Sequence, residues 1–330
     1  MVNVNNVYCA PITALRVILD SKHLKEIIFL LVDTIDSSHD DILKELVRIL
    51  QSLFGHAAQA LTPTKLLELL YPEEKTARKQ QAEDILLKIL TRIQNLTQDE
   101  KYHNSSNPKH AEASLKFKQY FSIHLDIKES FTFEGKERSS VHQLQEVRTS
   151  FQVNVSSIKK RKPSMLDVIR EIKKTENTHE GQQFESLTLE RKRIRGRRSE
   201  TVAKFSPCII INIDRVVFKQ AHERPRRNNS APPPPPVCSK DCTLISFTPT
   251  AEFNTGSVHV LSKIILHHGD KTQVNTGHYS CIIKEDTKDE NSWCHFNDDK
   301  QSRGLSFDSV LKYCTDNSSV MTIGCFVYEL

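Results

Sequence analysis

The chain has 330 residues, of which 38% are hydrophobic and 26% charged, the ordinary composition of a soluble globular protein. No window approaches the roughly 18 uncharged apolar residues of a membrane-spanning helix, and the asparagine-rich start is unlike a secretory signal. We therefore expect an intracellular protein without membrane contact, built as one large domain or two smaller ones.

The formal net charge of +5 conceals an uneven distribution. Residues 159–227 hold 19 Lys and Arg against 9 Asp and Glu, so the remainder of the chain is net acidic. The basic clusters at 159–163 and 191–198 are typical of nuclear import signals or nucleic-acid contacts, although a solvated loop explains them equally well. Few aromatic residues are interleaved with them, so we do not expect a nucleic-acid partner. The predicted localisation is the cytoplasm, the nucleus or both.

The eight cysteines fit an intracellular protein with reduced thiols. Only Cys238 and Cys242 lie close together, in the sequence CSKDC, and no second pair stands at the spacing of a zinc site. We therefore expect no metal ion and no cofactor.

Residues 10–100 have a helical pattern. Pro11 suits the first turn of a helix, where a missing backbone N–H has no intrahelical partner to lose. Apolar residues then recur at helical spacing in 40–54 and 79–96. Residues 101–130 are mixed.

From about residue 131 the pattern changes to short strands separated by polar turns. One helix interrupts it at 164–174, with Ser164 as its expected cap, and the prolines at 232–236 cannot join a sheet ladder. The strand-like segments are 130–135, 151–155, 208–218, 258–269, 277–284, 292–298 and 320–330. The predicted fold class is α+β: residues 1–130 mainly helical, and 131–330 β-rich with a basic, proline-rich insertion at about 176–240.

Three residues suggest nucleophilic catalysis. Cys9 stands at the head of a predicted helix, where unpaired N–H groups and the helix dipole favour a thiolate. A cysteine nucleophile also requires an imidazole, and that imidazole requires an acceptor that fixes its tautomer. His278 and Asn297 supply these groups in the order Cys, His, Asn of papain-like proteases. Taken singly, each residue also fits an ordinary structural role.

Several segments in the same order resemble the catalytic domain of ubiquitin-specific proteases, over nearly the whole chain. In chain order, they correspond to the family's cysteine box, a helix with an acidic position, a strand with a Pro and an Arg, a strand with His-x-Gly, and the histidine box. The last two segments both belong to the histidine box. The segments are NNVYCAPITALRVIL (5–19), QQAEDILLKIL (80–90), SPCIIINIDRVVF (206–218), VHVLSKIILHHG (258–269), TGHYSCIIK (276–284) and SWCHFNDD (292–299). The resemblance implies a papain-like fold of residues 1–330 with a helical thumb, a β palm and β fingers.

The resemblance also implies roles for individual residues. Cys9 would be the nucleophile, His278 the base, and Asn297 the group that orients the imidazole. Asp298 would be a second acceptor or would assist oxyanion stabilisation through water.

Three further residues would contact the substrate. Gly277 and Tyr279 would border the passage of the incoming peptide. Asp84, at the acidic helix position, would pair with arginines of the ubiquitin tail, although a solvated helix carboxylate is the alternative.

The sequence departs from the family pattern at several places. Val4 stands five residues before the nucleophile, where the family has the oxyanion-hole Asn, with Asn3 and Asn5 on either side. Tyr8 places a bulky side chain next to Cys9. The stretch that corresponds to the fingers has no cysteine near residues 133–145, so the zinc knuckles of many members are lacking and we expect strand pairing alone to hold the fingers.

The predicted function is that of a divergent thiol-dependent deubiquitinase, with ubiquitin or ubiquitinated proteins as partners. The alternative is a catalytically weak or inactive module that binds ubiquitin or another protein on the same fold. The sequence does not predict the oligomeric state.

Overall fold

The computed structural model describes residues 8–34, 40–54, 63–72, 81–99, 107–174, 176–177, 183–189, 192–219, 237–269, 277–286, 288–298 and 300–330. The helices in this part of the chain are α1 (Cys9–Leu19), α2 (Lys22–Val32), α3 (Asp41–Phe54), α4 (Thr64–Leu70), α5 (Ala82–Gln98), α7 (Pro108–Phe121), α8 (Met165–Lys173) and α9 (Phe307–Asp316). The strands are β1 (Ser122–Phe133), β2 (Lys136–Val147), β3 (Phe151–Asn154), β4 (Glu176–Asn177), β5 (Gln183–Glu185), β6 (Arg193–Lys204), β7 (Cys208–Asp214), β8 (Val216–Lys219), β9 (Val237–Lys240), β10 (Thr250–Asn254), β11 (Ser257–His268), β12 (His278–Lys284), β13 (Trp293–Asn297), β14 (Lys300–Leu305) and β15 (Met321–Glu329).

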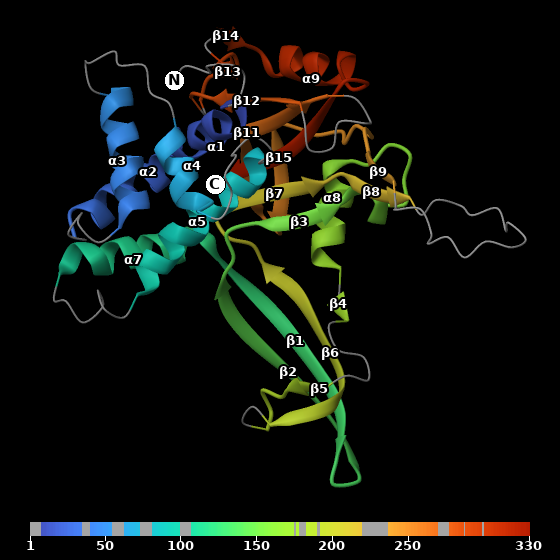
Figure 1. Cartoon of the computed structure of the whole chain (residues 1–330). Helices are drawn as coiled ribbons and strands as arrows, with labels where there is room; N and C mark the ends of the chain where they lie inside the picture. Colours follow the sequence, from blue (N-terminus) through green and yellow to red (C-terminus); the bar gives the residue numbers. More distant parts are fainter. Residues whose placement is uncertain are drawn as a thin grey trace, which may run out of the picture.

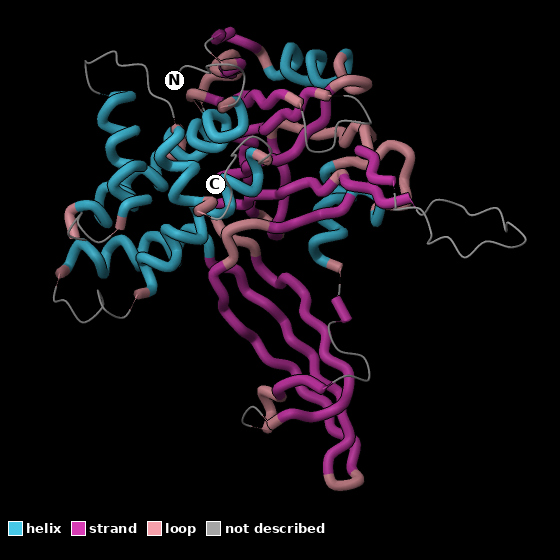
Figure 2. The backbone as a smooth tube through the Cα atoms, viewed as in Figure 1, coloured by secondary structure: helices cyan, strands magenta, loops and turns pink. Residues whose placement is uncertain are grey.

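The strands form two main sheets, and the predicted α+β class is confirmed. An eight-stranded sheet has the order β14-β13-β12-β11-β15-β7-β3, with β10 paired to β11. A five-stranded sheet has the order β2-β1-β6-β4, with β5 paired to β6. Figures 1 and 2 show that helices α1 to α5 and α7 gather on one side, whereas α8 and α9 lie among the strands. None of the helices in the described ranges is long and apolar enough to cross a membrane.

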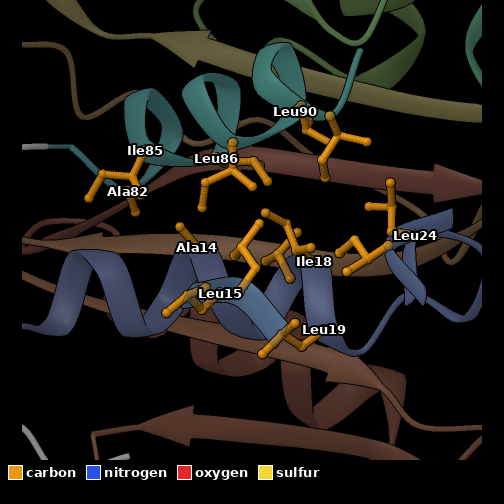
Figure 3. Packing of buried hydrophobic residues seen from close by; sticks show 14 of the residues in the cluster. Ala14, Leu15, Ile18, Leu19, Leu24, Ala82, Ile85, Leu86 and Leu90 are labelled. Atoms are coloured by element: carbon orange, nitrogen blue, oxygen red, sulfur yellow. The ribbon is translucent and has the colours of Figure 1, made fainter. Parts of the chain in front are cut away.

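Helix α1 is the centre of the helical part. Ten of its 11 residues are buried, as expected for a helix that is apolar on all sides. Leu15 and Ile18 face the buried side of α5, where Ile85 and Leu86 lie (Figure 3). Burial of such side chains contributes roughly 1.5–3 kcal/mol each. This packing fixes the position of Cys9, the first residue of α1.

The eight-stranded sheet has apolar side chains on both faces. One face packs against α1 and the other helices of the first third, and the other packs against α8 and α9. Helix α8 begins where the sequence predicts. Ser164 accepts a hydrogen bond from the Asp167 N–H, and Asp167 accepts one from Ser164 N in return.

The boundaries differ from the sequence prediction in two ways. Strand β1 begins at Ser122, directly after α7, so the helical part ends earlier than residue 130. The range 176–240 is not simply an insertion, because β6 belongs to the five-stranded sheet and β7 to the eight-stranded one. The basic composition of this range concealed β6, whereas β7 falls within the predicted strand-like segment 208–218. The proline run itself lies outside the described residues.

The five-stranded sheet is a long extension that points away from the rest of the molecule (Figure 1). It corresponds to the predicted fingers. Strands β1 and β2 form a hairpin of 12 paired positions, and β6 pairs antiparallel with β1 on its other edge. Phe131, Phe184 and Ile194 form a small apolar cluster near the far end.

A buried carboxylate holds the loop after β5 to this extension. Glu129 of β1 is fully buried and accepts hydrogen bonds from Ser186 Oγ (2.8 Å), Leu187 N (2.9 Å) and Thr188 Oγ1 (3.0 Å). The expectation that strand pairing alone holds the fingers is therefore wrong. No local sequence pattern predicts this contact, because the partners lie more than 50 residues apart.

Glu129→Gln is expected to lower the free energy of unfolding by about 1–3 kcal/mol, because an amide donor would replace an oxygen that only accepts. Burial opposes ionisation of Glu129, but the hydrogen bonds from Leu187, Ser186 and Thr188 outweigh it, so the pKa is lowered from 4.5. The ionised group therefore stabilises the fold above its unfolded pKa, and this contribution is lost as pH falls through the lower folded pKa.

The matched control is Glu137→Gln, which alters an exposed carboxylate on β2. Thermal unfolding at pH 7 should separate the two variants, and the difference should shrink in acid. Equal melting temperatures at pH 7 would show that Glu129 does not hold the loop.

Candidate active site

Cys9 is the first residue of α1 and is 6% exposed. The N-cap residue of its helix, Tyr8, makes no side-chain capping hydrogen bond. The Tyr8 hydroxyl accepts a hydrogen bond from Thr64 Oγ1 of α4 at 3.0 Å, so it is held on the neighbouring helix. The arrangement leaves the positive end of α1 at the thiol.

His278 opens β12, the strand that packs against α1 (Figure 1). Its Nε2–H donates to Asn297 Oδ1 at 2.5 Å, and the Cys9 side chain acts on the charge of the same ring. Since Nε2 is taken by Asn297, Nδ1 is the nitrogen left for the thiol. The antiparallel pairing of β12 with β13 brings Asn297 to this position from 19 residues away. The structure thus unites all three predicted groups.

Asp298 lies beside the same imidazole. Its Oδ2 is 3.8 Å from His278 Nε2. This distance is longer than that to Asn297 Oδ1, but it allows an ion pair with the protonated imidazole. The backbone of Asp298 is left-handed, with φ of 55°, at the turn into β14. The second acceptor predicted from the sequence is therefore adjacent to the ring.

The surroundings of His278 favour its charged form. The interaction with Cys9, assisted by Asn297 and the charge of Asp298, raises the pKa of His278 to about 9, although burial acts in the opposite direction. Below that pH the ring carries a proton. An imidazolium next to the thiol stabilises a thiolate and later supplies a proton to a leaving amine.

Gly277 has a structural reason to be glycine. Its φ is 141°, and a Cβ at this position would lie 2.2 Å from His268 O and 2.5 Å from His267 Nε2. The residue before His278 therefore lies directly against β11. The role predicted for Gly277 in the peptide passage stays a prediction.

A cavity of about 100 Å³ lies between α5 and strands β7, β11, β12 and β15. Tyr279 and His267 line it with stacked rings, 4.5 Å apart and 11° from parallel. Asp84 lines it from α5, with an exposed side chain. The structure thus places both Tyr279 and Asp84 at the same cavity, and their contacts with a substrate stay predictions.

Glu83 also lines the cavity, although no sequence pattern predicted it as a site residue. The Glu83 carboxyl fills the space above Gly324: a Cβ on that glycine would lie 1.6 Å from Glu83 Oε1. Burial raises the pKa of Glu83 to about 7, and its Oε2 has no hydrogen-bond partner among the described residues. Gly324 in β15 was the signal that the sequence offered. The sequence alone does not show that Glu83 of α5 packs against this glycine.

Some predicted features lie outside the described residues. Val4, Asn3 and Asn5 belong to residues 1–7, so the oxyanion-hole position is not described. Among the described residues, no group of three or more His, Cys, Asp or Glu side chains could hold a metal ion. The Cys242 thiol lies 3.9 Å from Lys240 O.

A cysteine at a helix N-terminus, an imidazole on an adjacent strand and an amide acceptor define the site of a papain-like thiol hydrolase. A scan against protein-family models matches residues 3–315 to the ubiquitin carboxyl-terminal hydrolase family, and the chain therefore belongs to that family. A search of curated proteins found no match. Membership of this family supports the general activity of a cysteine-type ubiquitin hydrolase.

Asn297→Ala is expected to lower kcat by about 10- to 100-fold, the cost of one hydrogen bond to a charged group. Asp298 lies near enough to retain part of the orientation, so the double variant with Asp298→Ala should lose much more. Because Asn297 raises the pKa of His278, its removal should also move the alkaline limb of the pH profile to lower pH. Complete loss of activity in Asn297→Ala alone would rule out a contribution from Asp298.

Proposed function

We propose that the protein is a thiol-dependent deubiquitinase that hydrolyses isopeptide bonds at the C-terminal glycine of ubiquitin. The observation that carries the proposal is the imidazole of His278, which hydrogen-bonds to Asn297 and interacts with Cys9 in a member of this family. The partners are ubiquitin and ubiquitinated proteins.

The reaction proceeds in two stages. The Cys9 thiolate attacks the carbonyl carbon of the terminal glycine, and the C–N bond to the lysine breaks as the His278 imidazolium protonates the leaving amine. His278 then removes a proton from water, which attacks the thioester and releases the ubiquitin carboxylate and the Cys9 thiolate. Asn297 keeps the Nε2–H tautomer throughout, so Nδ1 is the nitrogen that exchanges the proton.

The cavity beside Tyr279 suits the tail of such a substrate. A tail that ends in two glycines needs little width, and the stacked rings of Tyr279 and His267 provide a flat wall for it. Asp84, at the same cavity, supplies a carboxylate for an arginine of the tail.

Val4 favours a second candidate function. An oxyanion-hole donor typically contributes about 100- to 1,000-fold in rate, and Val4 supplies none from its side chain. A chain without that donor would bind ubiquitin and turn it over slowly or not at all.

Hydrolysis of a fluorogenic ubiquitin amide tests the proposal. The wild type should turn over, and Cys9→Ser should not. Cys242→Ser is the matched control, because it alters a half-buried cysteine to which we assign no part in the reaction. Ubiquitin binding with no turnover in the wild type would favour the binding module over the deubiquitinase.

A further inference from the structure

Two further histidines lie on the sheet face that carries His278. His268 stands directly opposite His278 in the pairing of β11 with β12. Their ring centroids are 5.4 Å apart, at 34° to one another. His295 of β13 is the third, and its ring lies 5.0 Å from Tyr313 of α9.

Ser280 connects the two additional histidines. Its side chain is fully buried, and its Oγ lies 2.7 Å from His268 Nε2 and 3.0 Å from His295 Nε2. A hydroxyl has one proton to give, so at least one of the two rings must donate to it. The shared hydroxyl therefore couples the tautomers of His268 and His295 and fixes the direction in which each ring points.

Only one of the three imidazoles is charged near neutral pH. Burial, followed by repulsion from His278, His295 and Lys240, lowers the pKa of His268 to about 4. Burial and His278 lower the pKa of His295 as well. His278 itself faces Cys9 and Asp298, which favour its proton. A neutral ring can thus lie against the catalytic imidazolium without repelling it.

We propose that His268, Ser280 and His295 are positioning residues that hold the ring of His278 in line between Cys9 and Asn297. The inference rests on the proposed function, because it concerns the same reaction. The contacts of its two ring nitrogens, with Cys9 and Asn297, fix the ring along the line between these residues. The ring can still rotate about that line. The His268 ring limits that tilt from one side, and Ser280 keeps His268 in place.

The first test removes only the shared oxygen. Ser280→Ala should lower kcat for a fluorogenic ubiquitin amide about tenfold and leave KM unchanged, because ring misplacement affects the chemical step rather than binding. The matched control is Ser262→Ala, which removes another buried hydroxyl of the same sheet, one that donates to Val327 O at 3.1 Å. Ser262→Ala should leave kcat unchanged.

Variants of His268 separate positioning from simple packing. His268→Gln keeps a neutral group that can hydrogen-bond to Ser280, so it should retain more activity than His268→Leu. His268→Lys places a permanent positive charge beside His278, so the alkaline limb of the pH profile should move down by about one pH unit or more.

A readout without ubiquitin keeps this inference separate from the proposed function. The rate at which iodoacetamide alkylates Cys9, measured by peptide mass, reports the Cys9–His278 pair alone. Slower alkylation in Ser280→Ala than in Ser262→Ala supports the positioning role even if the wild type does not hydrolyse ubiquitin. Equal alkylation rates in these two variants would overturn it.

Discussion

Replacing His278 by alanine is expected to lower kcat/KM for ubiquitin amides by roughly 10⁴- to 10⁶-fold, because one imidazole serves as both base and acid. The effect should exceed that of Asn297→Ala, since Asn297 only orients the ring. The matched control is His124→Ala, which removes an exposed histidine on β1 and should leave the rate unchanged.

The pH dependence of the wild type adds a second check on His278. Its pKa is raised to about 9, so the activity that depends on the imidazolium should persist at neutral pH and fall as pH rises through about 9. The charged ring also stabilises the fold. That contribution is fully present below the unfolded pKa of about 6.5 and is lost as pH rises through the folded pKa. A His278→Ala variant that keeps a tenth of the wild-type rate would contradict the assigned role.

Gly277→Ala is the second change with a large expected effect. A methyl group at this position would meet His268 O at 2.2 Å, and the φ of 141° is strained for any L side chain. The start of β12 must therefore move, and His278 moves with it. A displacement of about 1 Å at a catalytic group can cost about 100-fold in rate, and the backbone strain costs about 1–3 kcal/mol of stability.

The matched control for Gly277→Ala is Gly135→Ala, at the tip of the β1–β2 hairpin. Gly135 also has a positive φ, 74°, but a Cβ there would meet nothing within 4 Å. Gly135→Ala should therefore cost some stability and leave kcat unchanged. If Gly277→Ala affects turnover no more than this control does, His278 does not depend on the close approach of Gly277 to β11.

Features with local causes could be predicted from the sequence. The helical period of α5, the capping by Ser164 at α8 and the strand-like runs of β11, β12 and β15 all appear in the structure. The order of Cys9, His278 and Asn297 also suggested one site. A cysteine, an imidazole and an amide in this order are typical of papain-like proteases, although their spacing along the chain is not specific.

Features that depend on register or on distant packing could not be predicted. The pairing of His268 with His278 follows from the alignment of β11 with β12. Glu129 holds a loop more than 50 residues away, and Glu83 occupies a space left by Gly324 of another element. Each of these residues is unremarkable in its own segment, and only the fold gives it a partner.

The most direct test of the central claim is the reaction of the purified chain with ubiquitin that carries a C-terminal electrophile. We expect a covalent adduct of one ubiquitin, with the modified peptide containing Cys9, in the wild type and in Cys242→Ser. The adduct should be absent in Cys9→Ala and strongly slowed in His278→Ala. A wild-type chain that binds the probe but forms no adduct at Cys9 would contradict the account of a working thiol hydrolase.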